Sequence, residues 1–273
     1  MAKATAKDGL GLHYHVVGEA GPWVVFIQGL SLSGRFWFDI PERISKTYGV
    51  RAIVLDNRGI GRSERVSAPF SMKTMADDVA SVLDHAGCER ATVVGISMGG
   101  MISQHVAIQH PSRVEALALF ATTPGLPLGR LPAPSSLQLL ARLPFTKGRA
   151  GGELAARLLL PPEKQGQFEQ LFSRWPEAFA QDPQEPRSFY LQLLAIAGHS
   201  TGARLSSIRA PTAVTAGRAD VLVPPVNSER IAAKIPGAEL ELIDGVGHSI
   251  FTEDPAAMDR ALTRVWKRLG RVL

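Results

Sequence analysis

The sequence predicts an α/β protein in which a mostly parallel central sheet carries helices on both faces and a helical segment is inserted late in the chain. Two observations support this fold class. Apolar runs of strand length alternate with helical patterns over residues 1–122 and again over 208–273. The runs are almost continuously apolar, which is typical of parallel strands that are buried on both faces. The alternation stops at Thr123 and resumes after residue 207.

The strands are expected where β-branched and other apolar residues cluster. The first run is LHYHVV at 12–17, and the second is WVVFIQ at 23–28, which ends at Gly29. The later runs are 51–56, 91–96, 114–122, 212–217 and 238–244.

Helices are expected between these strands. Residues 72–87 have the apolar spacing of an amphipathic helix that ends at Gly87, and a helix over 98–110 stops before Pro111. The other helices of this part of the chain are expected over 36–47, 226–235 and 254–270.

The segment 123–207 breaks the pattern because it is rich in proline and contains no strand-like run. Some 85 residues without secondary structure would be unusual in a compact protein, so the segment is interpreted as an inserted helical subdomain. Its helical patches are expected over 136–143, 151–160, 164–174 and 187–198.

Composition and charge narrow the class of partner. The chain has 273 residues, of which 45% are hydrophobic, and a formal net charge of +5 with Lys and Arg scattered along it. This argues against a nucleic-acid partner. Cys88 is the single cysteine, so no internal disulfide is possible. The first ten residues lack the apolar core of a signal peptide, and no stretch approaches the roughly 20 apolar residues of a membrane helix. We therefore expect a cytoplasmic protein with no membrane partner.

The stretch GISMGG at 95–100 carries the main chemical signal, because it lies between a strand and a helix. Gly-x-Ser-x-Gly in this context predicts a nucleophile elbow, a tight turn that lifts the hydroxyl of Ser97 clear of the sheet. Glycines at 95 and 99 remove the side chains that would collide there. The alternative is a glycine-rich turn with a solvated serine.

A serine hydroxyl needs a base to take its proton. His248 follows the last expected strand in a glycine-rich turn, and Asp220 follows the strand before it. The chain order Ser97, Asp220, His248 is the order of a serine–histidine–acid triad on this type of sheet. Asp244 is an alternative acid, since it ends the strand that leads to His248.

The remaining histidines are interpreted mainly as structural. His13 and His15 lie on an early strand that we expect at the sheet edge, whereas His199 ends the helical insertion and can face a substrate.

Acyl transfer also requires donors for the oxyanion that develops on the substrate carbonyl. The backbone N–H of Met98, directly after the nucleophile, is one expected donor. The backbone N–H of Leu30, in the QGLSLSG turn after the second strand, is the other.

Taken together, these segments resemble the α/β-hydrolase superfamily over nearly the whole chain. Within it, the chain is most similar to the group of enol-lactonases, small carboxylesterases and cofactor-free haloperoxidases. Members of this group carry a helical cap between the sixth and seventh core strands, which implies a core of 1–122 and 208–273 and a cap of 123–207. The resemblance rests on GISMGG, on QG at 28–29, LDNRGIGRS at 55–63, IRAPTAV at 208–214, GRAD at 217–220 and GVGHS at 245–249.

One position departs from the family pattern. The family usually has His-Gly where this chain has Gln28-Gly29, and that histidine generally supports the oxyanion loop. Glutamine can also form hydrogen bonds, so Gln28 is retained as a residue of the substrate site. Within LDNRGIGRS, Asp56 and Arg58 are interpreted as fixing a turn; the alternative is that Arg58 lies at the rim of the pocket.

The reaction expected from these residues is hydrolysis of a carboxylic ester or lactone through an acyl-enzyme on Ser97. The same triad can instead cleave a C–C bond, remove a methyl ester from a natural product or make peracids. A ligand receptor with vestigial hydrolysis is the alternative from another class.

The expected cap is rich in leucine and aromatic residues, which favours a small to mid-sized apolar substrate bound in part by Trp175. No metal-ligand spacing, dinucleotide-binding fingerprint or P-loop is present, so neither a metal nor a cofactor is expected.

Overall fold

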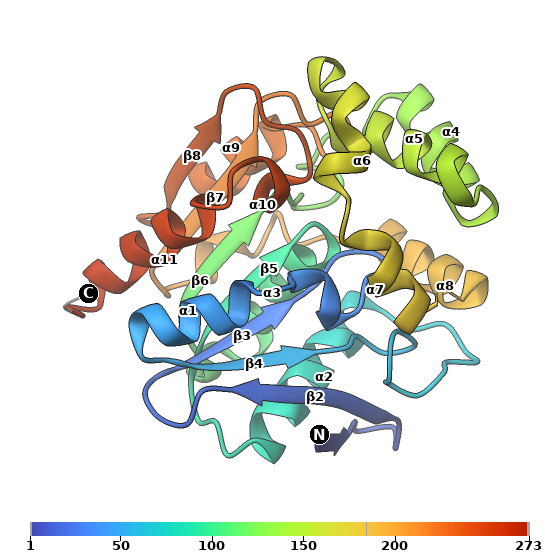
Figure 1. The fold of residues 1–273 in the computed structure, drawn as a ribbon. Helices are drawn as coiled ribbons and strands as arrows, with labels where there is room; N and C mark the ends of the chain where they lie inside the picture. The colour runs from blue at the N-terminus through green and yellow to red at the C-terminus, as the bar shows by residue number, and fades with distance from the viewer. Residues whose placement is uncertain (1, 184, 272–273) are drawn as a thin grey trace.

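The structure is a computed structural model that describes residues 2–183 and 185–271. Within these residues eight strands form one sheet in the order β1-β2-β4-β3-β5-β6-β7-β8 (Figure 1). β1 and β2 pair antiparallel, as do β2 and β4, and all other neighbours are parallel. The strands are β1 (Ala2–Thr5), β2 (Gly11–Val17), β3 (Trp23–Ile27), β4 (Arg51–Leu55), β5 (Ala91–Ile96), β6 (Val114–Phe120), β7 (Thr212–Gly217) and β8 (Glu239–Ile243).

The helices account for most of the other described residues. The α-helices are α1 (Ile40–Tyr48), α2 (Met72–His85), α3 (Met98–Gln109), α4 (Pro134–Arg142), α5 (Gly148–Leu159), α6 (Phe168–Leu171), α7 (Trp175–Gln181), α8 (Pro186–Ala197), α9 (Val226–Lys234), α10 (Ile250–Glu253) and α11 (Ala257–Arg268). The 3₁₀ helices are η1 (Gly34–Trp37), η2 (Pro111–Arg113), η3 (Leu143–Phe145), η4 (Pro162–Gln167) and η5 (Leu205–Ser207).

Two hydrophobic cores explain why the strands are apolar without alternation. Successive side chains of a strand point to opposite faces of the sheet. Val25 and Ile27 of β3 pack in the core beneath α2, α3 and α9, whereas Val24 and Phe26 pack in the core beneath α1 and α11. Because both faces are covered, every position of β3 is buried in apolar surroundings, except the half-buried Trp23 at its start.

Local signals set the helix boundaries. The hydroxyl of Ser71 accepts the N–H of Thr74, and the Thr74 hydroxyl accepts the N–H of Ser71, which forms a capping box at the start of α2. Helix α1 is capped at its C-terminus by Gly49, whose φ of 61° is left-handed and therefore favours glycine. On α11 the buried Trp266 donates its indole N–H to the Thr92 hydroxyl at 2.9 Å, which joins the last helix to β5.

The α/β fold class expected from the sequence is confirmed, with small differences in the elements. β1 is not among the expected strands, because AKAT is short and weakly apolar. It pairs with β2, so β2 is not the edge strand and the expected edge position of His13 and His15 is wrong. The helix expected over 36–47 is split into η1 and α1. The short helices α7 and α10 lie outside the helices that the sequence analysis expected.

The segment 123–207 leaves the sheet after β6 and returns to it before β7, although these two strands are neighbours. Helices α4 to α8 all lie in this segment, and Figure 1 shows them together beyond the ends of the strands to which the arrowheads of β4 and β6 point. The two ends of the segment meet in an antiparallel bridge between Gly125 and Ser200. The Thr201 N–H also donates to the Pro124 carbonyl at 2.9 Å.

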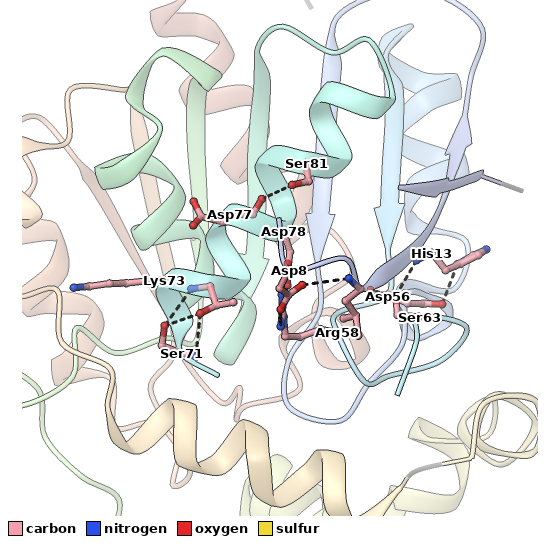
Figure 2. A network of polar contacts seen from close by, with 12 residues as sticks. Asp8, His13, Asp56, Arg58, Ser63, Ser71, Lys73, Asp77, Asp78 and Ser81 are labelled. Atoms are coloured by element: carbon pink, nitrogen blue, oxygen red, sulfur yellow. Dashed lines mark hydrogen bonds and ion pairs between the residues drawn. The ribbon is translucent and has the colours of Figure 1, made fainter. Parts of the chain in front are cut away.

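The turn after β4 is held by a polar network (Figure 2). One oxygen of the buried Asp56 accepts the N–H of Gly34 at 2.7 Å, and the other lies 3.0 Å from Nδ1 of His13. Arg58 is also buried, and its guanidinium forks onto Asp78 of α2 through two bonds of 2.6 Å. A third bond, of 2.9 Å, joins Arg58 to Asp8. Both polar partners of Arg58 are thus structural carboxylates, which supports the interpretation that this segment fixes a turn.

Candidate active site

Ser97 occupies the single residue between β5 and α3, and its backbone is strained. Its φ of 55° and ψ of −120° are uncommon for a residue with a side chain. A conformation of this kind costs of the order of 1–3 kcal/mol and persists only where the surroundings impose it. Here the Ser97 N–H donates to the Phe120 carbonyl at 2.9 Å, and the Thr122 hydroxyl donates to the Ser97 carbonyl at 2.8 Å.

The two glycines that flank Ser97 are required by close backbone approach. A Cβ at Gly99 would lie 2.0 Å from the Ile27 carbonyl oxygen, and a Cβ at Gly95 would lie 2.4 Å from the Gly99 carbonyl oxygen. Neither neighbour is a side chain that can move aside. The spacing Gly-x-Ser-x-Gly therefore has a steric cause at both ends, as the sequence analysis expected.

The structure brings His248 and Asp220 together. Nδ1 of His248 lies 2.7 Å from Oδ2 of Asp220, and both side chains are buried. The other carboxylate oxygen of Asp220 accepts the N–H groups of Leu222 and Val223 at 2.9 and 2.8 Å, which fixes the orientation of the carboxylate.

This contact also sets the tautomer of the imidazole. A carboxylate oxygen can only accept, so the hydrogen of this contact is on Nδ1 of His248 and points to Asp220. Nε2 is then left with its lone pair. Among the described residues the structure gives Ser97 and His248 no hydrogen bond to each other, and such bonds often tighten only when a substrate is bound.

Asp244 does not take the place of Asp220. Its side chain is 88% exposed and forms an ion pair with Arg218 at 2.7 Å. The acid that contacts His248 is therefore Asp220.

The loop that carries His248 is held by residues that the sequence analysis missed. Glu253 accepts the Gly247 N–H at 2.8 Å, and its other oxygen pairs with Lys164 of η4 at 3.0 Å. The side chain of Glu253 is fully buried, and this burial outweighs the pull of Lys164 and raises the pKa of its carboxyl. The Ser249 N–H donates to the Leu159 carbonyl at 3.0 Å. The 123–207 segment thus contacts the histidine loop directly.

The turn after β3 lies directly over Ser97. A Cβ at Gly29 would be 3.3 Å from Cβ of Ser97 and 3.8 Å from its hydroxyl oxygen. Gln28 is buried, and its side-chain oxygen accepts the Gly29 N–H at 2.8 Å, while Asn57 donates to the Gln28 carbonyl at 3.1 Å. Gln28 therefore supports the turn by accepting the backbone N–H of its neighbour Gly29.

The two expected oxyanion donors are next in sequence to the two residues in close approach, Gly29 and Ser97. Leu30 follows Gly29 in the turn. Met98 is the first residue of α3, so its N–H is not used by the hydrogen-bond ladder of the helix.

Trp175 and His199 occupy different surroundings. The Trp175 ring packs 5.4 Å from the ring of Phe36 in η1, and against Phe172 and Phe179. His199 is 4% exposed; its Nε2 lies 2.9 Å from the Thr123 carbonyl and its Nδ1 lies 3.3 Å from Nε2 of His105. The structure thus places His199 in a buried contact with α3, where its two ring nitrogens are already engaged. The expectation that it faces a substrate gains no support from this placement.

The paired histidines are both held neutral. A carbonyl can only accept, so Nε2 of His199 carries a hydrogen and its Nδ1 accepts from His105. Burial lowers the pKa of His105 to about 3, with a smaller contribution from His199, and burial lowers the pKa of His199 to about 4. The Nδ1 of His105 is buried without a hydrogen-bond partner among the described residues, so there is no acceptor for a second ring proton.

Acid is expected to destabilise the fold through this pair. The folded-state pKa values lie below the ordinary value near 6.5, so the unfolded chain binds the protons first and stability is lost as the pH falls below about 6.5. Between pH 7 and pH 5 the expected loss is about 2 kcal/mol of unfolding free energy per histidine. Urea unfolding at both pH values measures it. His105→Phe is expected to reduce the loss by about half. A variant whose pH dependence equals that of the wild type would refute the assignment.

A metal site is a separate question. No group of three or more His, Cys, Asp or Glu side chains within 2–183 and 185–271 is arranged to hold a metal ion.

Comparisons with known proteins agree with this geometry. The family model described as the alpha/beta hydrolase fold matches residues 22–255. The chain belongs to the α/β-hydrolase family. No helix in the described part of the chain is both long and apolar enough to cross a membrane.

Several relatives match almost end to end. A protein of Variovorax paradoxus (strain S110) named "Putative carbamate hydrolase RutD" is 31% identical over 92% of this chain and 94% of its own length. A protein of Mycobacterium tuberculosis named "Putative non-heme bromoperoxidase BpoC" is 28% identical over 93% of this chain and 97% of its own. The solved structure titled "Est816 as an N-Acyl homoserine lactone degrading enzyme" superposes with a TM-score of 0.80 at 28% identity, covering 96% of this chain and 98% of that chain. The fold and these relatives support a hydrolase that acts on a small molecule.

Proposed function

We propose that this protein is a serine hydrolase that cleaves a carboxylic ester or lactone through an acyl-enzyme. Two observations support the proposal: the strained backbone of the elbow serine Ser97 under the Gly29 turn, and the contact of His248 Nδ1 with Asp220, which leaves Nε2 of the imidazole for another partner. Oriented in this way, Nε2 of His248 is the atom able to accept the Ser97 proton.

The proposed reaction has two halves. Ser97 Oγ attacks the carbonyl carbon and passes its proton to His248, while the N–H groups of Leu30 and Met98 stabilise the oxyanion. The tetrahedral intermediate collapses, and the leaving alcohol takes the proton from His248. Water then loses a proton to His248 and attacks the acyl-enzyme, and the proton returns to Ser97 as the acid departs. With a lactone, the alcohol and the acid are two ends of one product.

The segment 123–207 is proposed to act as the cap over this site, as the family resemblance implies. Trp175 and its neighbours Phe36, Phe172 and Phe179 form an aromatic cluster where this segment contacts η1. A cap lined in part by aromatic side chains favours a small to mid-sized apolar substrate. The names of the relatives point to the same chemistry, because carbamates and lactones both present a carbonyl to a nucleophile.

The test is covalent labelling with a fluorophosphonate, followed by mass spectrometry to locate the adduct. Labelling at Ser97, with release of p-nitrophenol from short p-nitrophenyl esters, supports the proposal. A protein that stays unlabelled and hydrolyses neither esters nor lactones contradicts it. Adding a diketone and a methyl ester to the panel tells C–C bond cleavage and methyl-ester cleavage apart from the hydrolysis of simple esters.

A further inference from the structure

The turn over Ser97 has an unusual backbone at its third position. The Leu32 N–H points to the Gly29 carbonyl at 3.4 Å, which closes a four-residue turn with Leu30 and Ser31 at its centre. Ser31 has a φ of 61°, whereas Leu30 is not among the residues with positive φ. This combination is that of a type II turn, which normally has glycine or asparagine at its third position. A serine there is strained and needs outside support.

That support comes from the inserted segment. Gln192 of α8 is completely buried, and its side-chain oxygen accepts the Ser31 N–H at 2.8 Å across 161 residues of sequence. Because a backbone N–H only donates, the oxygen of the carboxamide must face Ser31, and its NH₂ group must face away. The NH₂ nitrogen is buried without a partner among the described residues. A buried amide group without a partner costs free energy, so the bond to Ser31 is the contact that orients this carboxamide.

A second contact attaches the same loop to the same segment. Asp182, just after α7, is buried and accepts the Ser33 hydroxyl at 2.7 Å, and it forms an ion pair with Nε of Arg35 at 3.0 Å. The loop from Gly29 to Arg35 is therefore held by the inserted segment at two points, through Gln192 and through Asp182. Gln192 is the nearer of the two to the proposed oxyanion donor.

The chemical consequence follows from the geometry of turns. The Ser31 N–H belongs to the central peptide of the turn, and type I and type II turns differ by a flip of that peptide. In the type I form Ser31 would have a negative φ and no strain. Loss of the Gln192 bond thus allows the Leu30–Ser31 peptide to flip, which reverses a peptide dipole of about 3.5 D next to the Leu30 N–H.

We propose that Gln192 is a positioning residue that holds this peptide in its type II orientation and so keeps the oxyanion turn in its active form. The inference rests on the proposed function, since it concerns the donor beside Ser97. It assigns to the inserted segment a part in building the catalytic turn in addition to covering it. A displacement of about 1 Å in such a turn can reduce the rate by roughly 100-fold.

The first experiment compares Gln192→Met with Gln181→Met on p-nitrophenyl acetate. Methionine matches glutamine in length but removes the amide acceptor, and Gln181 is an exposed residue of the neighbouring α7. Gln192→Met is expected to lower kcat by roughly 10- to 100-fold, with KM changed less than threefold. Fluorophosphonate labelling of Ser97 is expected to slow in parallel, because the label also develops negative charge at the oxyanion turn. Gln181→Met is expected to match the wild type.

The second variant, Gln192→Glu, gives a readout that a merely structural role would not move. Both the neutral and the ionised carboxyl of this variant can accept the Ser31 N–H, but only the ionised form places a negative charge near the developing oxyanion. The ratio of its kcat to that of the wild type is therefore expected to rise as the pH is lowered from 8 to 5.5. If Gln192→Met does not fold, this ratio decides the question.

The outcomes separate the two proposals. A wild type that labels at Ser97, together with a Gln192→Met variant whose kcat is within threefold of it, overturns the positioning role alone. A flat kcat ratio for Gln192→Glu does the same. A wild type that neither labels nor hydrolyses any ester overturns the proposed function and the positioning role together.

Discussion

Replacing Ser97 by alanine is expected to reduce kcat on p-nitrophenyl esters by about 10⁴-fold or more. The variant removes the only hydroxyl at the elbow and leaves no atom that can form the acyl-enzyme. Residual turnover would come from direct attack of water on the ester, with the oxyanion donors still stabilising the transition state. The positive φ of residue 97 is retained in alanine at a similar cost, so the variant is expected to fold. Steady-state kinetics and circular dichroism on the same preparation check both statements.

Two further proteins sharpen this prediction. The exposed Ser206→Ala is the matched control and is expected to keep full activity. The double variant Ser97→Ala/His248→Gln is expected to be no slower than Ser97→Ala alone, because residues that act as one unit lose their effects together and not additively. The proposed roles of Ser97 and His248 would be contradicted if the fold-loss of the double variant equalled the product of the two single losses. An active Ser97→Ala protein would contradict them as well.

The sequence was sufficient for features whose cause is local. The elbow at Ser97 follows from glycines two residues away on either side, and the structure shows the backbone contacts that require them. The sheet follows from apolar runs whose length and spacing leave few alternatives. The contact between Asp220 and His248 was predictable because each residue follows a strand of the same sheet, and the carboxyl ends of neighbouring parallel strands lie at one edge.

The residues that the sequence did not reveal act through contacts between distant segments. Gln192 and Asp182 lie 161 and 149 residues from their partners in the loop after β3, and periodicity contains no information about such pairs. Glu253 is five residues beyond His248, but its ion-pair partner Lys164 lies in the inserted segment. A polar residue within the apolar stretch LQLLAIA was the one available signal for Gln192. His199 was placed correctly at the end of the insertion, but position alone did not reveal its engagement by His105.

The buried pair of Arg58 and Asp78 is expected to have the largest single effect on stability. Both side chains are about 95% buried and are joined by two hydrogen bonds in a forked geometry. Burial opposes the charge of Arg58, but the Asp78 carboxylate more than compensates and raises the pKa of the guanidinium. Arg58→Met would leave Asp78 buried without its cation, which typically costs about 3–5 kcal/mol. Urea unfolding at pH 7 measures this loss.

The double variant Arg58→Met/Asp78→Leu tests whether the loss in Arg58→Met comes from an Asp78 carboxylate that is buried without its cation. Removing both charges also removes the uncompensated carboxylate, so part of the stability is expected to return. The exposed pair Arg149 and Glu153 on α5 is the contrast, since Arg149→Met is expected to cost less than about 1 kcal/mol. A double variant no more stable than Arg58→Met would show that the loss comes from packing of the long side chains, because packing is not restored when the second charge is removed.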